Sequence, residues 1–389
     1  MRPFWTIVHR WIGLITAAFL FLAGVTGAVI SWDHELDDWL NPHLIETHSP
    51  GRAQSPLLLA EQVEKRYPEI AFQFIPLSIE EGKSLELGVN ARLNPATNKL
   101  FEPGFNQIFL DPVSGEELGK REWGAVWPIT KETFVSFLYM LHFSLHLPEI
   151  WGIDSWGIWL LGIIAILWTL DCFVGAYLTL PGRKRSRNNT SDWRLINQSV
   201  VSETVDPDLI AKSFWQRWKP AWKIRARKGV YKLNFDLHRA VSLWTFGVLF
   251  IIAFTAFSLN LYREVFFPVM NSFSQLTPTP FDLREPRPKH EPIMPEITFV
   301  DIVKLAKVKA NDKHWKEPAG SIFYSQSFGI YGVQFYYPED DHGVGGVGHK
   351  ILYFDGIDGR NLGETLPWEG TAADIFLQAQ FPLHSGRIL

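Results

Sequence analysis

Two histidines in this chain each stand directly before an apolar run that is long enough to cross a lipid bilayer. His9 precedes the run from Ile12 to Ile30, and His238 precedes the run from Val241 to Leu259; each histidine is followed at once by an arginine. An ionisable side chain at membrane depth is costly and usually functional, and imidazole is a common axial ligand of haem iron. The repeated pattern predicts that His9 and His238 hold one haem between two helices. Interfacial histidines beside topogenic arginines are the alternative.

A second set of histidines occupies corresponding places in the two halves of the chain. His142 and His384 each follow a leucine and come just before the place where a helix should enter the membrane from the other side. They are expected to hold a second haem. His146 lies four residues after His142, on the same face of a helix predicted at 131–147, so either residue can be the ligand; the other could contact a propionate. The chain has one cysteine, Cys172, and no C-x-x-C-H sequence, so any haem is of the non-covalent b type.

Hydropathy and charge predict how the chain crosses the membrane. Three apolar windows have the length of a transmembrane helix, and many of the 17 tryptophans lie at their ends. We interpret the first window as an uncleaved anchor, because it is long for a signal peptide and ends in a poor cleavage site. Basic residues are dense between Arg183 and Lys232, and acidic residues follow the first window. The positive-inside rule then places the N-terminus and the basic segment in the cytoplasm. The three windows are approximately 11–31, 156–180 and 240–261.

The segments outside the membrane contain an internal repeat. Each is predicted to form a helix followed by alternating strands and a turn of the form Asp-x3-Gly-x3-Gly, which begins at Asp111 in the first half and at Asp355 in the second. The repeat also implies a fourth apolar helix after His384, where this sequence has five more residues. We therefore expect a truncated or missing helix there, with a genuine three-helix protein as the alternative.

These features predict an α+β membrane protein, in which a bundle of transmembrane helices (three spans present, a fourth implied) carries two outer α/β units. The predicted parts are a first transmembrane helix, a first outer unit, an interfacial helix with the second transmembrane helix, a basic cytoplasmic loop, a third transmembrane helix, a second outer unit, and the start of a fourth helix. Their boundaries are 1–32, 33–130, 131–182, 183–235, 236–262, 263–383 and 384–389.

Other chemistries find less support in the sequence. Asp171 carries the one formal charge in the second apolar window and could serve a proton relay or a structural hydrogen bond. The histidines of the polar segments, including His342 and His349 in a Gly-rich loop, are expected to be solvated rather than to bind a metal. The chain has no Walker motif, no Rossmann glycine fingerprint and no H-E-x-x-H sequence. The basic segment is a topology feature and gives no reason to expect nucleic-acid binding.

Taken together, these motifs resemble the PepSY-associated transmembrane helix family, also called iron-regulated membrane proteins. The residues that carry the resemblance are His9-Arg10-Trp11-Ile12-Gly13, Leu141-His142-Phe143-Ser144-Leu145, Asp236-Leu237-His238-Arg239, Leu383-His384-Ser385-Gly386 and the two Asp-x3-Gly-x3-Gly turns. The resemblance extends over essentially the whole chain and implies a bacterial inner-membrane location, with the PepSY-like units in the periplasm.

The resemblance also implies a function, since the family includes di-haem reductases of ferric siderophores. The expected enzyme is an oxidoreductase with two b haems, or one if the last helix is missing. Its expected partners are membrane lipid, a ferric siderophore as substrate, and a quinone or a cytoplasmic reductase as the electron donor. Two alternatives remain open: a non-enzymatic PepSY module that binds peptides or proteases, and a component of a siderophore transporter. Bound haem would separate the reductase from both.

Overall fold

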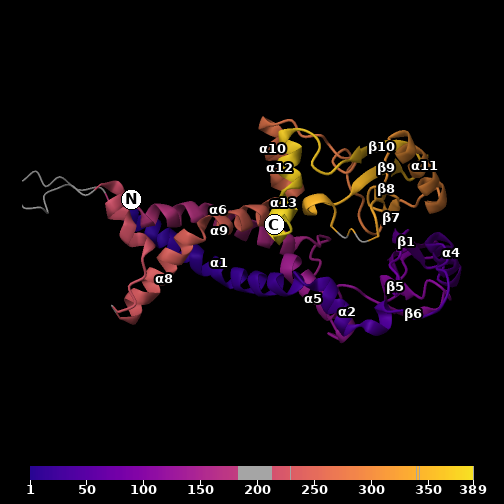
Figure 1. Cartoon of the computed structure of the whole chain (residues 1–389), viewed down its shortest axis with the longest axis horizontal. Helices are drawn as coiled ribbons and strands as arrows, with labels where there is room; N and C mark the ends of the chain where they lie inside the picture. The colour runs from indigo at the N-terminus through magenta and orange to yellow at the C-terminus, as the bar shows by residue number, and fades with distance from the viewer. Residues whose placement is uncertain (183–212, 228, 339, 341, 389) are drawn as a thin grey trace, which may run out of the picture. The chain divides into compact units, whose positions relative to one another are not determined.

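The computed structural model describes residues 1–182, 213–227, 229–338, 340 and 342–388. Most of the predicted cytoplasmic loop at 183–235 lies outside these residues. The chain divides into two compact units, which are described separately. The first unit comprises residues 1–18 and 164–254, and the second comprises residues 19–163 and 255–389. Three long helices contribute to both units: α1 (Arg2–Ile30), α6 (Trp156–Thr179) and α9 (Phe246–Asn260) (Figure 1).

Two helices have the length and hydropathy of membrane spans. Helix α1 has 29 residues with a mean hydropathy of 2.2 in its most apolar window, and α6 has 24 residues with a value of 2.1. Either exceeds the ~20 residues that a bilayer requires. Many apolar side chains of α1 are exposed, as at Phe21, which suits contact with lipid acyl chains.

The third predicted helix differs from the expectation of one continuous apolar run at 240–261. The structure has α8 (Val230–Trp244) followed by α9, with a bend of 71° between them. Thr245 lies at the break, where its hydroxyl donates to the carbonyl of Val241 at 2.9 Å, and Gly247 follows. A side-chain bond into the helical ladder and a glycine both favour a kink. Counted as one bent span, the pair gives up to three spans in the described part of the chain.

The second unit contains an eight-stranded antiparallel sheet in the order β10-β9-β8-β7-β1-β2-β5-β6 (Figure 1). The strands of each half lie together, and the halves join where β1 pairs with β7, with Phe74 opposite Phe323. The strands are β1 (Ile70–Pro76), β2 (Leu85–Ala91), β5 (Gln107–Leu110), β6 (Glu117–Arg121), β7 (Ala319–Ser325), β8 (Ile330–Phe335), β9 (Lys350–Asp355) and β10 (Asn361–Thr365); β3 (Leu93–Asn94) and β4 (Lys99–Leu100) form a separate hairpin.

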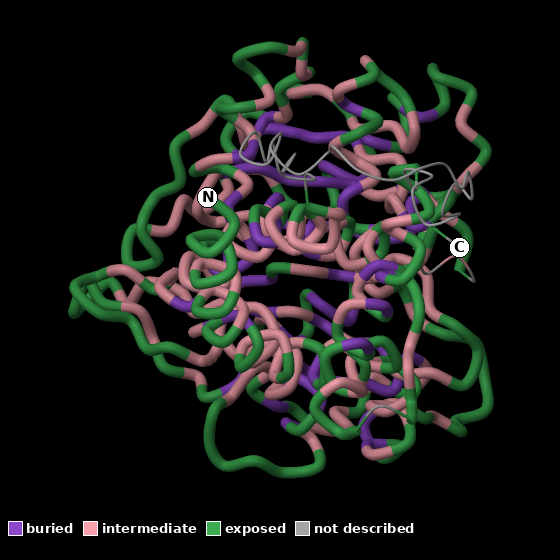
Figure 2. Tube along the Cα trace, turned by 90° about the vertical axis from the view of Figure 1, so that its left-hand side faces the viewer, coloured by how far each residue is buried: buried purple, intermediate pink, exposed green. Residues whose placement is uncertain are grey.

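One helix from each half covers the sheet. Helix α4 (Pro56–Arg66) packs on β1, and α11 (Phe299–Asp312) packs on β7 and β8. Both helices are amphipathic and bury their apolar faces, which include Leu59 and Ile302, in one core shared with the alternate residues of the strands. In β7 and β8 the residues between these positions are buried as well; Figure 2 shows buried segments of the chain in purple.

The predicted repeat is confirmed by the sheet and by its turns. Each half supplies a helix and then four strands in the same spatial order. In the first turn, Asp111 Oδ1 accepts a hydrogen bond from Val113 N at 2.8 Å, and in the second, Asp355 Oδ1 accepts one from Ile357 N at 2.8 Å. Gly115 and Gly359 each take a positive φ, which glycine adopts at little cost.

The remaining helices and helical turns complete the two units. In the first unit these are α7 (Phe214–Trp218) and the 3-10 turn η3 (Lys219–Trp222); in the second unit they are α2 (Asp33–Leu40), α3 (Pro42–Ile45), α5 (Lys131–Ser144), η4 (Tyr262–Phe266), α10 (Phe267–Phe273), the 3-10 turn η5 (Val344–Gly346), α12 (Ala372–Gln378) and α13 (Gln380–Ser385). Helices α5 and α13 carry the histidines of the second set.

Candidate functional site

The first unit brings His9 and His238 together. His9 projects from the start of α1 and His238 from α8, and the centroids of their imidazole rings are 6.0 Å apart with the ring planes inclined by 41°. The two residues lie far apart in the sequence, so the tertiary fold alone makes them neighbours. The structure thus places the first predicted pair face to face.

A buried carboxylate orients the His9 ring. Asp171 on α6 is 6 % exposed, and its carboxylate oxygens lie 2.9 and 3.0 Å from His9 Nδ1. An ionised carboxylate can only accept a hydrogen bond, so Nδ1 carries the proton. The lone pair of Nε2 is then available to a metal, which is the tautomer that metal-ligating histidines usually adopt.

The second unit contains a second pair of the same kind. The ring of His142 on α5 and that of His384 on α13 have their centroids 6.2 Å apart, with the planes inclined by 53°. In this pair threonine hydroxyls take the place of the carboxylate. Thr26 Oγ1 lies 3.0 Å from His142 Nδ1, and Thr255 Oγ1 lies 3.1 Å from His384 Nδ1.

The hydrogen bonding of Thr26 determines the tautomer of His142. The Thr26 hydroxyl donates its one proton to the carbonyl of Leu22 at 2.8 Å. With its proton on that bond, the Thr26 oxygen accepts from His142 Nδ1, which corresponds to the tautomer with the lone pair on Nε2. His142 and His9 thus keep the lone pair on the same ring nitrogen, Nε2.

Glycines allow both rings to lie against long apolar helices. A Cβ atom added to Gly27 of α1 would come within 2.9 Å of His142 Cε1, and one added to Gly175 of α6 would come within 3.2 Å of His9 Cε1. A larger residue at either place would displace the imidazole. Gly27 thus lets the His142 ring approach α1 closely, as small residues do between packed membrane helices.

The spacing of the rings fits two imidazoles on opposite sides of one metal ion. Two metal–nitrogen bonds of about 2.0 Å and two ring radii of about 1 Å amount to about 6 Å, close to the observed 6.0 and 6.2 Å. Among the described residues, no three His, Cys, Asp or Glu side chains form a group that could hold a metal ion. Imidazole is also a common ligand of haem iron, whose other ligands come from the porphyrin.

His146 does not belong to the second pair. The predicted helix at 131–147 is wrong at its end: α5 stops at Ser144, and Leu145 and His146 both have a positive φ. His146 folds back, with Nε2 2.8 Å from the Phe137 carbonyl and its ring stacked on that of Phe137. Pro148 disfavours helical backbone just before it, so the i, i+4 relation with His142 is lost.

The histidines of the outer region have other neighbours. His349 Nε2 lies 2.7 Å from the Asp340 carbonyl, and its ring stacks on Tyr336. The rings of His34 and His342 meet edge to face at 6.4 Å. His43 lies 3.0 Å from a carboxylate oxygen of Glu132 at the surface.

Sequence reasoning did not find the two threonines. Thr26 follows His9 by seventeen residues, and Thr255 follows His238 by the same interval. Each threonine contacts a histidine of the second pair. Each also lies seventeen residues after a histidine of the first pair, toward the other end of the helical stretch. This equal spacing in the two halves is the signal that could have revealed them.

Comparison with known families identifies the group to which this chain belongs. The model of the PepSY-associated TM region matches residues 6–389. The chain is a member of the PepSY-associated TM family. Comparison with curated proteins gives no significant match. The match agrees with the resemblance carried by the histidine motifs and the two turns. With the two candidate spans and the large antiparallel sheet, it shows a membrane-associated α+β protein.

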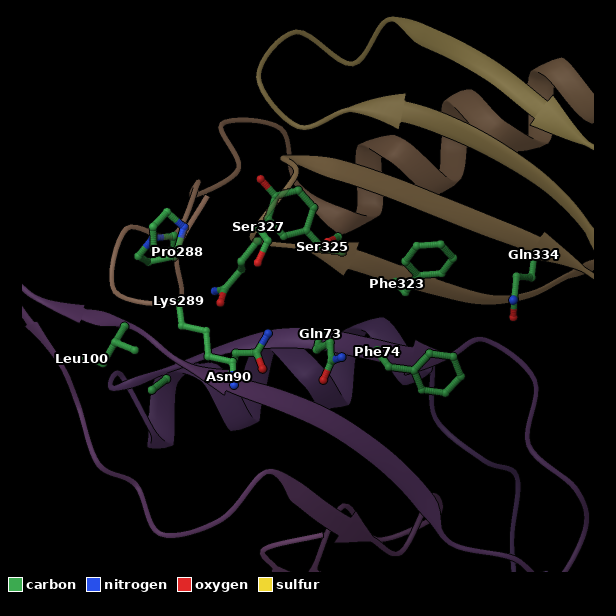
Figure 3. Close-up of a pocket in the computed structure, with 14 residues that line it drawn as sticks. Gln73, Phe74, Asn90, Leu100, Pro288, Lys289, Phe323, Ser325, Ser327 and Gln334 are labelled. Atoms are coloured by element: carbon green, nitrogen blue, oxygen red, sulfur yellow. The ribbon is translucent and has the colours of Figure 1, made fainter. Parts of the chain in front are cut away.

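The eight-stranded sheet of this PepSY-associated protein also forms a groove. The groove has a volume of about 470 Å³ and is lined by residues of β1, β2, β7 and β8, on both sides of the seam where β1 pairs with β7. Lys289, of the loop before α11, also lines it (Figure 3). A β-bulge between Phe72 and Phe74 lets both Gln73 and Phe74 line it. Its other polar lining residues are Asn90, Ser325, Gln326, Ser327 and Gln334. The groove has the size of a small-molecule site.

Proposed function

We propose that this protein is an inner-membrane oxidoreductase that carries electrons through two b-type haems to a ferric siderophore in the periplasm. The observation that supports it best is that four histidines form two pairs, with ring centroids 6.0 and 6.2 Å apart. In each pair, a hydrogen bond holds the Nδ1 atom of at least one histidine. When bound, haem supplies a one-electron carrier at each pair.

In this proposal, residues of the chain would hold and orient the two haems. His9 and His238 would ligate one iron, and His142 and His384 the other, while Asp171 and Thr26 keep the ring nitrogens in the ligating tautomer. His9 lies near the start of α1, and Gly27, which contacts His142, lies near its end. With the N-terminus in the cytoplasm, the first site would serve the inner face of the membrane and the second the outer face.

The net reaction moves one electron from a donor to each Fe(III), which becomes Fe(II). A quinol donor would release two electrons and two protons and so reduce two ferric ions; a cytoplasmic reductase is the other class of donor. Reduction frees the metal because the hard oxygen donors of a siderophore bind Fe(II) less tightly than Fe(III). We propose the groove between the two repeats as the place where the ferric siderophore binds.

An absorption spectrum of the full-length protein, purified in detergent from haem-supplied cells, tests this proposal. We expect a six-coordinate b-type spectrum, two haems per chain by pyridine haemochrome, and reoxidation of the dithionite-reduced protein by a ferric siderophore. His238→Ala and His142→Ala should each remove one haem. His146→Ala is the matched control, because His146 is bonded to Phe137 instead of facing another histidine, and it should keep both.

Each other outcome has a distinct meaning. Protein without haem would overturn the reductase and favour a PepSY module that binds peptides. Haem that is bound but not reoxidised by ferric siderophores would overturn the proposed substrate while retaining electron transfer. A loss of haem in His146→Ala equal to that in His142→Ala would overturn the assignment of the pair.

A further inference from the structure

A short segment that precedes α8 combines basic and aromatic side chains. Residues 213–227 include α7 and the turn η3, and they contain five Lys or Arg, three tryptophans and no Asp or Glu. Trp215 is 69 % exposed, and its neighbour Phe214 is exposed as well. Tryptophan beside Lys and Arg is typical of the membrane–water interface. The composition and exposure of this segment therefore indicate contact with lipid headgroups.

The segment contains a small basic pocket. The pocket has a volume of about 180 Å³, and its lining residues are Gln216, Lys219, Pro220, Lys223 and Arg225. Three of these five side chains carry a positive charge, and none of the five is acidic. The volume is smaller than the roughly 300–1,000 Å³ of a site for a drug-sized ligand. The pocket therefore suits a small anionic group such as a phosphate.

A buried carboxylate holds the pocket on α8. Asp236 has no exposed surface, and its carboxylate accepts hydrogen bonds from Arg225 at 2.7 Å and from Arg239 at 2.9 Å. Arg239 also donates to the carbonyl of Pro220, in the wall of the pocket, at 2.9 Å. Because one carboxylate faces two guanidinium groups, this anchor keeps a net positive charge. It fixes the pocket without cancelling the charge of the lysines.

The pocket lies at the level of a membrane surface. Trp218 Nε1 donates to the hydroxyl of Thr179, the last residue of α6, at 3.2 Å, and Arg217 donates to the carbonyl of Gly182 at 3.0 Å. Helix α6 has 24 residues, which corresponds to about 36 Å at 1.5 Å per residue. The hydrocarbon core of a bilayer is about 30 Å thick. The end of α6, and the segment bonded to it, therefore lie among the lipid headgroups.

We propose that Lys219, Lys223 and Arg225 form a binding site for the headgroup phosphate of an anionic phospholipid. A free phosphate ion has the same chemistry for the lysines, but the exposed ring of Trp215 and the place at the end of α6 favour a lipid. Basic side chains near an anionic membrane surface each strengthen its binding. The proposal is independent of haem and of siderophore reduction, so either can fail without the other.

Native mass spectrometry of the full-length protein, delipidated in detergent and titrated with phosphatidylglycerol, tests the site. The double variant Lys219→Gln/Lys223→Gln should bind phosphatidylglycerol about tenfold or more weakly than the wild-type protein. Lys219→Arg/Lys223→Arg keeps both charges and should retain the binding. Lys307→Gln/Lys309→Gln is the control for net charge, because both lysines are exposed on α11, and it should bind as the wild-type protein does.

Equal affinity of the wild-type protein and the double glutamine variant would overturn the proposal. So would equally tight binding of phosphatidylcholine to the wild-type protein, since that headgroup carries the phosphate without a net charge. An arginine variant as weak as the glutamine variant would overturn the role of charge. Displacement of phosphatidylglycerol by an equal concentration of inorganic phosphate would overturn the lipid as the ligand and show a site for a soluble anion.

Discussion

His142 and His384 face each other with their ring centroids 6.2 Å apart, although one lies on α5 and the other on the last helix of the chain. Neither histidine is on a long apolar helix, yet each is held by a threonine of such a helix. The second unit thus uses short helices to present imidazoles and long helices to orient them.

Gly27 should be required for the second site. A Cβ atom there would lie 2.9 Å from His142 Cε1, so Gly27→Leu should push the ring out of line and reduce haem from two per chain toward one. Gly24→Leu is the matched control on the same helix, because nothing lies within 4 Å of a Cβ atom at that position. Pyridine haemochrome analysis of both variants gives the count. Equal haem loss in the two would contradict the predicted contact.

Thr26 should contribute to haem affinity by orienting His142. Thr26→Val removes the oxygen that accepts the Nδ1 proton and should weaken haem binding at this site by about 10- to 100-fold. Thr16→Val is the matched control on the same helix and should leave haem binding at this site unchanged. Thr16 is also buried, and its hydroxyl donates to the backbone carbonyl of Ile12. Haem transfer to apomyoglobin, followed by absorption, measures the loss. If the two variants release haem at the same rate, Thr26 does not act through His142.

Asp355 should stabilise the outer sheet in a pH-dependent way. Burial by itself would raise the pKa of Asp355, but hydrogen bonds from Ile357 N and Arg284 outweigh burial and hold the pKa below its ordinary value of 3.8. The stabilisation is therefore complete above the ordinary pKa and is lost as the pH falls through the lowered one. Asp355→Asn should cost about 1.5–3 kcal/mol of local stability at pH 7.

Hydrogen exchange of peptides from β9 and β10 measures this cost at a fixed pH. Asp358→Asn is the control in the same turn, because Asp358 is exposed and accepts one backbone bond, from Arg360 N. The difference in hydrogen-exchange protection between Asp355→Asn and the wild-type protein should shrink when both are measured near pH 3. A difference that persists undiminished at low pH would show that shape rather than charge is responsible.

The groove should control the affinity for the ferric siderophore independently of haem. Gln73 is exposed within it, so Gln73→Trp should raise the KM for siderophore-driven reoxidation by about tenfold or more while haem content stays at the wild-type level. Glu61→Trp, on the exposed face of α4, should change neither. An unaltered KM in Gln73→Trp would place the substrate elsewhere.

Much of the local structure could be predicted from the sequence because local patterns produce it. Each half has the predicted helix before its strands, α4 and α11, and the two Asp-x3-Gly-x3-Gly turns form as expected. Apolar length was sufficient to identify α1 and α6 as candidate spans. The predictions were weaker where the ends of elements depend on distant contacts. Helix α5 ends at Ser144, and the Ser144 carbonyl packs against Gly157 of α6. A Cβ atom added to Gly157 would lie 1.6 Å from the Ser144 carbonyl oxygen.

The sequence by itself determined which residues could form the site, since duplicated histidine motifs stand before apolar runs in both halves. The tertiary structure decided how they combine: it joins His9 to Asp171, pairs His142 with His384, and excludes His146. It also joins the two repeats into one sheet through β1 and β7. The physical reason is that hydropathy and turn chemistry act over a few residues, whereas hydrogen bonds and ring contacts require groups that folding alone brings within a few ångströms.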